Sequence, residues 1–195
     1  HTTVIPHGVD ERFTFSPRPA RKIEDSSPEM PFRLLYVSTI NLYKHQLQVA
    51  EAITELRERG FPVIIDFIGE GYEPAMTSFR NILKQLDPEG SFLLYRGAIP
   101  FEELHIKYSE ADMFVFASSC ENMPNILLEA MAAGLPIVSS NSGPMPEVLA
   151  DAGKYFNPDD SSDIVGTIQE LLIDSRQRNI LASKAFYRAQ NYTWE

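Results

Sequence analysis

Short apolar runs alternate with helical segments along most of this chain, and this alternation restricts the fold more than any other feature. Six segments have the length and apolar content of buried strands: residues 32–38, 62–68, 91–95, 112–117, 136–140 and 153–156. Helical segments follow them, at residues 45–59, 73–86, 101–110, 124–133, 147–149, 162–173 and 176–191. Strands that alternate with helices form a parallel sheet covered on both faces. We therefore predict an α/β fold with three layers, α/β/α, and one domain over residues 1–195.

Composition excludes several classes of protein. The chain has 195 residues, 44% of them hydrophobic, which is enough for a full core. Its formal charge of -10 argues against nucleic-acid binding, which requires a basic surface. No apolar run approaches the ~18 residues of a membrane-spanning helix. The single cysteine, Cys120, excludes an internal disulfide and suits a reducing compartment, so we expect a cytoplasmic location.

Ligands of parallel α/β sheets bind where the loops at the carboxyl ends of the strands meet. The loops to consider here are 38–44, 69–71, 96–100, 118–124 and 139–145. The segment 18–31 is rich in proline and charge, and we interpret it as an exposed connection rather than a domain boundary.

The loop 118–124 and the helix after it form a candidate anion site. Pro124 suits a first helical turn, and the amides of Asn125, Ile126 and Leu127 would then be free to bind a phosphate. Glu129 lies roughly 7 Å further along the axis at ~1.5 Å per residue, and Glu121 precedes the helix. Two carboxylates could thus flank a phosphate and accept sugar hydroxyls. Because the helix is apolar nearly all round, we expect Glu129 to need a partner.

Other side chains leave alternatives open. Lys44 at the start of a helix opposes the helix dipole, which favours a ligand, although an exposed charge is the other interpretation. Cys120 is either a nucleophile or, with better support, a small buried filler. The Gly69 and Gly71 pair indicates either a tight turn or a weak dinucleotide motif. The four histidines lack metal-ligand spacing, so we predict no metal site.

The stretch from Glu121 to Val138 resembles the signature of glycosyltransferase family 4, also called group 1. It has two glutamates eight positions apart, followed by Ala-Met-Ala-Ala-Gly-Leu-Pro-Ile-Val. Further similar motifs lie at residues 4–13, 68–71, 95–97, 111–119 and 193–195. The resemblance implies the C-terminal, nucleotide-sugar-binding half of a two-domain GT-B enzyme, with a Rossmann-like fold. It places the N-terminal acceptor domain and a final crossover helix outside this chain.

The resemblance also implies roles for individual residues. Glu129 would bind the ribose hydroxyls, Glu121 would touch the transferred sugar, and Lys44 would bind the diphosphate, which makes Glu121 and Lys44 the catalytic candidates. The remaining donor-binding candidates are the sugar-facing and helix-start residues Asn122, Met123, Pro124, Asn125 and Ile126, the base-facing residues Gly97, Ala98 and Ile99, and Thr39.

Two features depart from the family pattern. The family pairs its lysine with an arginine, and this chain has Thr39 near the place of that arginine. Either Lys44 and the helix N-terminus then carry more of the diphosphate charge, or Arg96 or His45 helps. The sequence Asn122-Met123-Pro124 stands where the family often has Gly-Phe-Gly, and glycine permits a closer backbone approach.

The implied reaction is the transfer of a sugar from a UDP-, GDP- or ADP-sugar to an acceptor such as a glycan or a lipid, as in polysaccharide biosynthesis. The resemblance implies retention of configuration and no metal. With the acceptor half absent, we expect this chain to bind the donor without transferring sugar, and membrane contact to come only through that half. One alternative is a scaffold with a degenerate site. Another is an NAD oxidoreductase, which would need a glycine-rich loop, but residues 38–44 contain no glycine.

Overall fold

The centre of the molecule is one sheet of six parallel strands in the order β3-β2-β1-β4-β5-β6. A computed structural model describes residues 7–192, so parts of the motifs at 4–13 and 193–195 lie outside the described residues. The strands are β1 (Phe32–Val37), β2 (Val63–Ile68), β3 (Leu93–Gly97), β4 (Met113–Phe116), β5 (Ile137–Ser140) and β6 (Lys154–Phe156). The predicted parallel sheet is confirmed.

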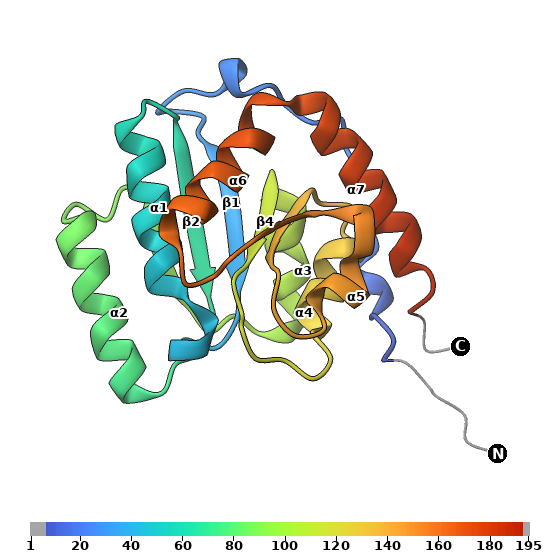
Figure 1. Cartoon of the computed structure of the whole chain (residues 1–195), viewed down its shortest axis with the longest axis horizontal. Coiled ribbons are helices and arrows are strands. Elements are labelled where there is room, and N and C mark those ends of the chain that lie inside the picture. The colour runs from blue at the N-terminus through green and yellow to red at the C-terminus, as the bar shows by residue number, and fades with distance from the viewer. Residues whose placement is uncertain (1–6, 193–195) are drawn as a thin grey trace.

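Helices cover both faces of this sheet. They are α1 (Gln46–Glu58), α2 (Glu73–Leu86), α3 (Phe101–Glu110), α4 (Asn125–Ala132), α5 (Met145–Leu149), α6 (Ser161–Ile173) and α7 (Ser175–Ala189). In Figure 1, α1 and α6 lie in front of the sheet and α3 and α4 lie behind it. Helix α1 packs against both α2 and α6, and α4 packs against α7. The three-layer α/β/α class is therefore confirmed.

The direction in which strands are added to the sheet reverses at β1. Leu34 of β1 is paired with Ile65 of β2 on one side and with Met113 of β4 on the other. The chain thus adds strands on one side of β1 as far as β3 and on the other side from β4 onward. Ligands bind α/β sheets at such a reversal, because the loops on its two sides diverge. The loops after β1 and β4 are consequently neighbours.

Strand β4 and helix α4 show why the segment around the candidate site is rigid. All four residues of β4 are buried, as expected for a strand covered on both faces. In α4, Leu127, Leu128 and Met131 are completely buried. Gly134 ends the helix region with φ +63°, and a Cβ there would lie 2.8 Å from the carbonyl oxygen of Phe15. A glycine is therefore required at the position that ends this helix.

Strand β3 begins later than predicted. Residues 91–95 were expected to form it, but the strand covers Leu93–Gly97. The carboxylate of Asp87 accepts hydrogen bonds from the amides of Phe92 and Leu93, at 2.7 and 2.8 Å. These bonds hold the chain in a turn at the point where the strand was expected to start.

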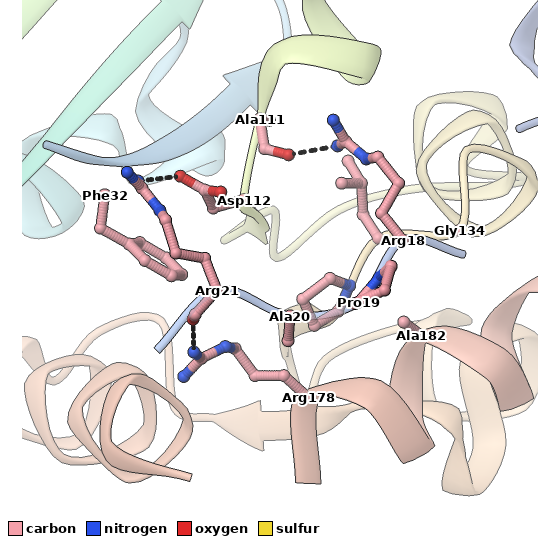
Figure 2. A pocket seen from close by; sticks show the side chains of 12 residues that line it. Arg18, Pro19, Ala20, Arg21, Phe32, Ala111, Asp112, Gly134, Arg178 and Ala182 are labelled. Atoms are coloured by element: carbon pink, nitrogen blue, oxygen red, sulfur yellow. Dashed lines mark hydrogen bonds and ion pairs between the residues drawn. The ribbon is translucent and has the colours of Figure 1, made fainter. Parts of the chain in front are cut away.

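The segment 18–31 runs over the surface, as predicted, but it is fastened to the domain. Ile23 within it is buried in the core. Arg18 donates to the carbonyl of Ala111 at 2.7 Å, and Arg21 forms an ion pair with Asp112 at 2.8 Å. Figure 2 shows both contacts at the amino end of β4. The description of this segment as a mere exposed connection was therefore incomplete.

Arg178 of α7 completes this fastening from below the segment (Figure 2). Its side chain is completely buried and donates to the carbonyls of Leu171, Leu172 and Arg21. A cavity of about 100 Å³ lies between Arg178 and the segment. The terminal nitrogens of the arginines around this cavity, Arg18, Arg21 and Arg178, already bond to carbonyl oxygens or to Asp112. The arrangement is therefore a structural clamp.

Replacing Arg178 by methionine is expected to lower the free energy of unfolding by about 3 kcal/mol, since it leaves buried carbonyls without donors. Urea unfolding followed by circular dichroism measures the change. Arg176→Met, two residues earlier on the exposed side of α7, is the matched control and should change stability by less than about 0.5 kcal/mol. Equal effects of the two substitutions would contradict the clamp.

Candidate functional site: a lysine and two glutamates at the carboxyl edge of the sheet

Lys44 and Glu121 meet between the loops that follow β1 and β4. Lys44 ends a short 3-10 helix, Leu42–Lys44, in the loop after β1, and Glu121 lies in the loop after β4. Their side chains form an ion pair and are only 8% and 16% exposed. The interpretation of Lys44 as an exposed charge is therefore wrong. The structure brings the two predicted catalytic residues into direct contact.

The backbone around Lys44 is fixed by a buried tyrosine. The Tyr36 hydroxyl donates to the carbonyl of Lys44 and accepts a hydrogen bond from the amide of Ala117. The Lys44 Nζ also lies 5.7 Å from the centre of the Phe116 ring. These contacts tie the loop after β1 to the end of β4. A ligand phosphate at this place would therefore meet a preformed cationic group.

Glu129 has the partner that its apolar helix required. Its Oε2 accepts a hydrogen bond of 2.8 Å from the hydroxyl of Tyr108, which lies on α3. Tyr108 is completely buried, with its ring edge-on to Phe13 and stacked on Phe114. Sequence reasoning missed Tyr108. The sequence does predict that a buried carboxylate needs a hydrogen-bond donor, because burial without one is costly. It does not show which residue provides that donor.

Burial controls the charge of Glu129. Desolvation raises the pKa of its carboxyl to about 7; the Tyr108 hydrogen bond opposes this shift, and the charge of Asp10 adds to it. Asp10 itself stays ionised, since hydrogen bonds from Arg12 lower its pKa to about 2. Glu129 is thus half ionised near neutral pH. A carboxyl of this kind changes its capacity to accept hydrogen bonds within the physiological range.

The pKa of Glu129 predicts how stability depends on pH. Its carboxyl titrates near 4.5 in the unfolded chain and at about 7 in the folded one, so the unfolded chain alone ionises between these values. Its contribution to stability is therefore fully present below pH 4.5 and is lost as pH rises towards 7, by up to about 3 kcal/mol. Urea unfolding at pH 4.5 and pH 8 gives the decrease in the free energy of unfolding between these two pH values. This decrease should be smaller in Glu129→Gln by the contribution of the Glu129 carboxyl. An unchanged pH dependence in the variant would refute the assignment.

The start of α4 differs in part from the prediction. Pro124 was expected in the first turn of the helix, but it lies just before the helix, and Asn125 begins it. In addition, the amide of Asn125 donates to the carbonyl of Met123 at 3.0 Å, and that of Leu127 donates to Pro124 at 2.9 Å. The prediction of three free amides is therefore wrong for these two, because the turn after the proline closes on itself.

The remaining predicted residues lie along the same edge of the sheet. Thr39 is exposed in the loop after β1, and its carbonyl accepts a hydrogen bond from the Gln46 amide side chain at 2.9 Å. Gly97, Ala98 and Ile99 lie at the end of β3, three strands from β4 in the sheet order. Asn122 and Asn125 are exposed, Met123 and Ile126 are half-buried, and Pro124 is buried.

Other sequence interpretations are resolved by the geometry. Arg96, considered as a helper of Lys44, is ion-paired to Asp66 at 2.5 Å. The Gly69 and Gly71 pair is a tight turn: Gly69 has φ +141°, and a Cβ there would overlap the carbonyl oxygen of Ser38. Cys120 is exposed, so its interpretation as a buried filler is wrong.

Neither a metal-binding cluster nor a membrane-spanning helix is present within residues 7–192. Within residues 7–192, no three His, Cys, Asp or Glu side chains are grouped so that they could hold a metal ion. In the same part of the chain, no helix combines the length and the apolar character needed to cross a membrane.

The sequence and the fold place this chain in a known family. The sequence model of the family described as "Glycosyl transferases group 1" matches residues 18–188, so this chain belongs to the group 1 glycosyltransferases. The predicted family resemblance is confirmed, and with it the half-GT-B architecture at the level of the fold.

Individual relatives agree with this assignment. The chain is 28% identical to sulfoquinovosyl transferase SQD2 of Arabidopsis thaliana over 96% of its own length and 36% of that protein. It is 30% identical to O-antigen chain mannosyltransferase B of Escherichia coli over 83% of its length and 42% of that protein. Anabaena Alr3699/HepE, solved in complex with UDP and glucose, superposes with a TM-score of 0.81 at 19% identity, over 98% of this chain and 52% of that one. The chain thus spans less than half the length of the two curated relatives.

Proposed function

We propose that this chain is the donor-binding domain of a glycosyltransferase that transfers a sugar from a nucleotide-diphosphate sugar. The observation that carries the proposal is the Lys44–Glu121 ion pair at the switch in strand order, with Glu129 on the helix that follows the Glu121 loop. The complex of HepE with UDP and glucose supports a nucleotide-sugar ligand for this fold. The N-terminal half of such an enzyme would complete the acceptor side.

The site divides the donor between its parts. Glu129 would accept hydrogen bonds from the two ribose hydroxyls, exchanging its Tyr108 contact or sharing it. Lys44 would bind the diphosphate, and the Glu121 carboxylate, displaced from Lys44, would face the hydroxyls of the sugar. The loop of Gly97, Ala98 and Ile99 would lie against the base, while Asn122 and Met123 would contact the sugar.

The chemical task of this half is to stabilise the leaving group. Departure of a nucleoside diphosphate from the anomeric carbon places negative charge on the phosphate oxygens while the sugar becomes oxocarbenium-like. A preorganised cation at those oxygens lowers the barrier electrostatically, and Lys44 is the side chain placed for that role. We further propose retention of configuration without a metal, and no sugar transfer by this chain on its own.

Isothermal titration of the chain with UDP, GDP and ADP tests the proposal. We expect at least one of them to bind in the micromolar range, about −8 kcal/mol, and the corresponding nucleotide sugar to compete for the same site. Binding of none of the three would favour a scaffold with a degenerate site. Tight binding of NAD alone would favour an oxidoreductase.

A further inference from the structure

The carboxyl edge of the sheet has few cations for an anionic ligand. In the loops that follow the six strands, the basic side chains are Lys44 and His45, whereas the acidic ones are Glu70, Glu121, Asp159 and Asp160. Lys44 is already neutralised by Glu121. Arg96, at the end of β3, is paired to Asp66. A diphosphate with about two negative charges would therefore enter an edge with no unpaired cation among these groups.

His45 has an unusual backbone conformation next to Lys44. Its φ of 51° and ψ of 32° are left-handed, and it caps the amino end of α1. A residue with a Cβ adopts this conformation at a cost that the surrounding structure must offset, and such outliers gather at functional sites. Glycine would meet the backbone requirement without strain. The backbone conformation therefore does not account for a histidine at this position, and its imidazole needs a separate explanation.

The His45 ring joins three loops. It is 7% exposed, and its Nε2 lies 2.9 Å from the hydroxyl of Ser119 in the loop after β4. Its Nδ1 lies 3.6 Å from Oδ1 of Asp159 in the loop after β6. The Ser119 hydroxyl is in turn 3.3 Å from the carbonyl of Tyr43. His45 thus connects the Lys44 loop to the loop that carries Glu121.

This environment fits an imidazole that gains a proton. In the neutral ring, Nδ1 is buried without a hydrogen-bond partner among the described residues. In the charged ring, Nε2–H donates to Ser119, whose hydroxyl donates to Tyr43, and Nδ1–H faces the Asp159 carboxylate. Burial lowers the pKa of His45, and Asp159 opposes that effect. Burial thus disfavours the charged ring, and a further negative charge nearby would favour it.

We propose that His45 takes up a proton from solvent when a diphosphate binds beside Lys44, and so becomes the second positive charge of the donor site. The inference rests on the proposed function. The proton enters at Nδ1, while Nε2 keeps its hydrogen bond to Ser119. A unit negative charge about 10 Å away raises the pKa of a cationic acid by about one unit at an effective dielectric constant of about 20. A diphosphate carries about twice that charge.

The charged groups near His45 are consistent with proton uptake by its ring. Helix α6 packs against α1, and the acidic groups at its start are Asp159, Asp160 and Asp163. Among them, Asp159 faces the His45 ring and favours its charged form. The only cation in the adjoining loops is Lys44, whose charge is balanced by Glu121. The incoming phosphate therefore supplies the change that shifts the proton equilibrium.

Calorimetric titration with inorganic pyrophosphate tests the proposal, because this probe has no ribose and does not involve Glu129. Enthalpies measured in two buffers of different ionisation enthalpy give the number of protons taken up on binding. His45→Asn keeps a residue that tolerates the left-handed conformation and removes the titrating ring. The ligand's own protonation cancels in the comparison of the two proteins.

We expect wild-type protein to take up as much as one proton more than His45→Asn near pH 6.5, and the difference to vanish by pH 8.5. The affinity for pyrophosphate should fall about tenfold in the variant at pH 6.5, as one pKa unit implies. Asp159→Asn, an exposed position, should reduce the uptake without altering the backbone. His105→Asn, on α3, is the matched histidine control and should retain it.

The two proposals fail in different ways. If UDP binds and the proton uptake is the same in wild type and in His45→Asn, the role of His45 is refuted and the donor site stands. If UDP, GDP, ADP and pyrophosphate all fail to bind to the wild-type chain, the donor site is refuted and the role of His45 with it.

Discussion

Replacing Lys44 by methionine is expected to lower the free energy of unfolding by about 3 kcal/mol and to weaken nucleoside-diphosphate binding by about 100-fold. The stability falls because Glu121, 16% exposed, is left as a nearly buried carboxylate without its cation. The affinity falls because a charge-assisted hydrogen bond to phosphate contributes about 1.5–3 kcal/mol. Urea unfolding and isothermal titration with the nucleotide that binds best measure the two effects.

A double variant separates these effects. In Lys44→Met with Glu121→Gln, the buried charge is removed together with its partner, so most of the stability should return while binding remains lost. Lys107→Met is the control, because Lys107 pairs with Glu110 on the surface of α3 and such pairs contribute about 0.5 kcal/mol. Recovery of binding in the double variant would show that Lys44 does not contact the diphosphate.

Replacing Glu129 by alanine is expected to weaken UDP binding about 100-fold or more and to leave pyrophosphate binding unchanged. The carboxylate would accept two ribose hydroxyls, and hydrogen bonds to a charged acceptor are worth about 1.5–3 kcal/mol each. Pyrophosphate has no ribose and therefore serves as the matched ligand. Equal losses for both ligands would show a general disturbance of α4 rather than a ribose contact.

The pH profile of the same titrations tests Tyr108 as the positioning residue of Glu129. With a carboxyl pKa of about 7, the affinity for UDP relative to that for pyrophosphate should rise between pH 6 and pH 8, since the ionised carboxylate is the better acceptor. Proton uptake by His45 favours both ligands at low pH and therefore cancels in this ratio. Tyr108→Phe removes the hydrogen bond that holds this pKa down, so its profile should shift to higher pH, with the loss at pH 7 recovered at pH 8.5. A uniform loss at every pH would instead indicate a purely structural effect.

Much of the fold follows from local patterns in the sequence. Apolar runs of strand length and helical periodicity predicted six strands and seven helices in the right order, because burial on both faces of a parallel sheet leaves a strong signal. The strand order could not be predicted in this way. It depends on which strands pair across the chain, and it is what makes the loops after β1 and β4 neighbours.

The candidate site was predicted in its parts but not in its pairings. Two glutamates and one lysine were found from motif spacing and from the cost of a charge in an apolar helix. The Lys44–Glu121 ion pair and the Tyr108–Glu129 hydrogen bond join residues 77 and 21 positions apart, and no local pattern encodes such contacts. The clamp of Arg178 on the segment 18–31 escaped prediction for the same reason.

The turn before α4 shows the limit of capping rules. A proline at the start of a helix predicts unpaired amides behind it. Here the turn lets Met123 and Pro124 accept two of those amides, so less of the phosphate interaction falls to the helix start and more to the side chains.

A crystal structure of the chain grown with UDP tests the central claim most directly. We expect the ribose hydroxyls at hydrogen-bond distance, about 2.7 Å, from the Glu129 carboxylate. We also expect the diphosphate to contact Lys44, with the Glu121 carboxylate moved away from Lys44. UDP bound elsewhere, for example in the cavity beside Arg178, with the Lys44–Glu121 pair intact and without contact to Glu129, would contradict the claim.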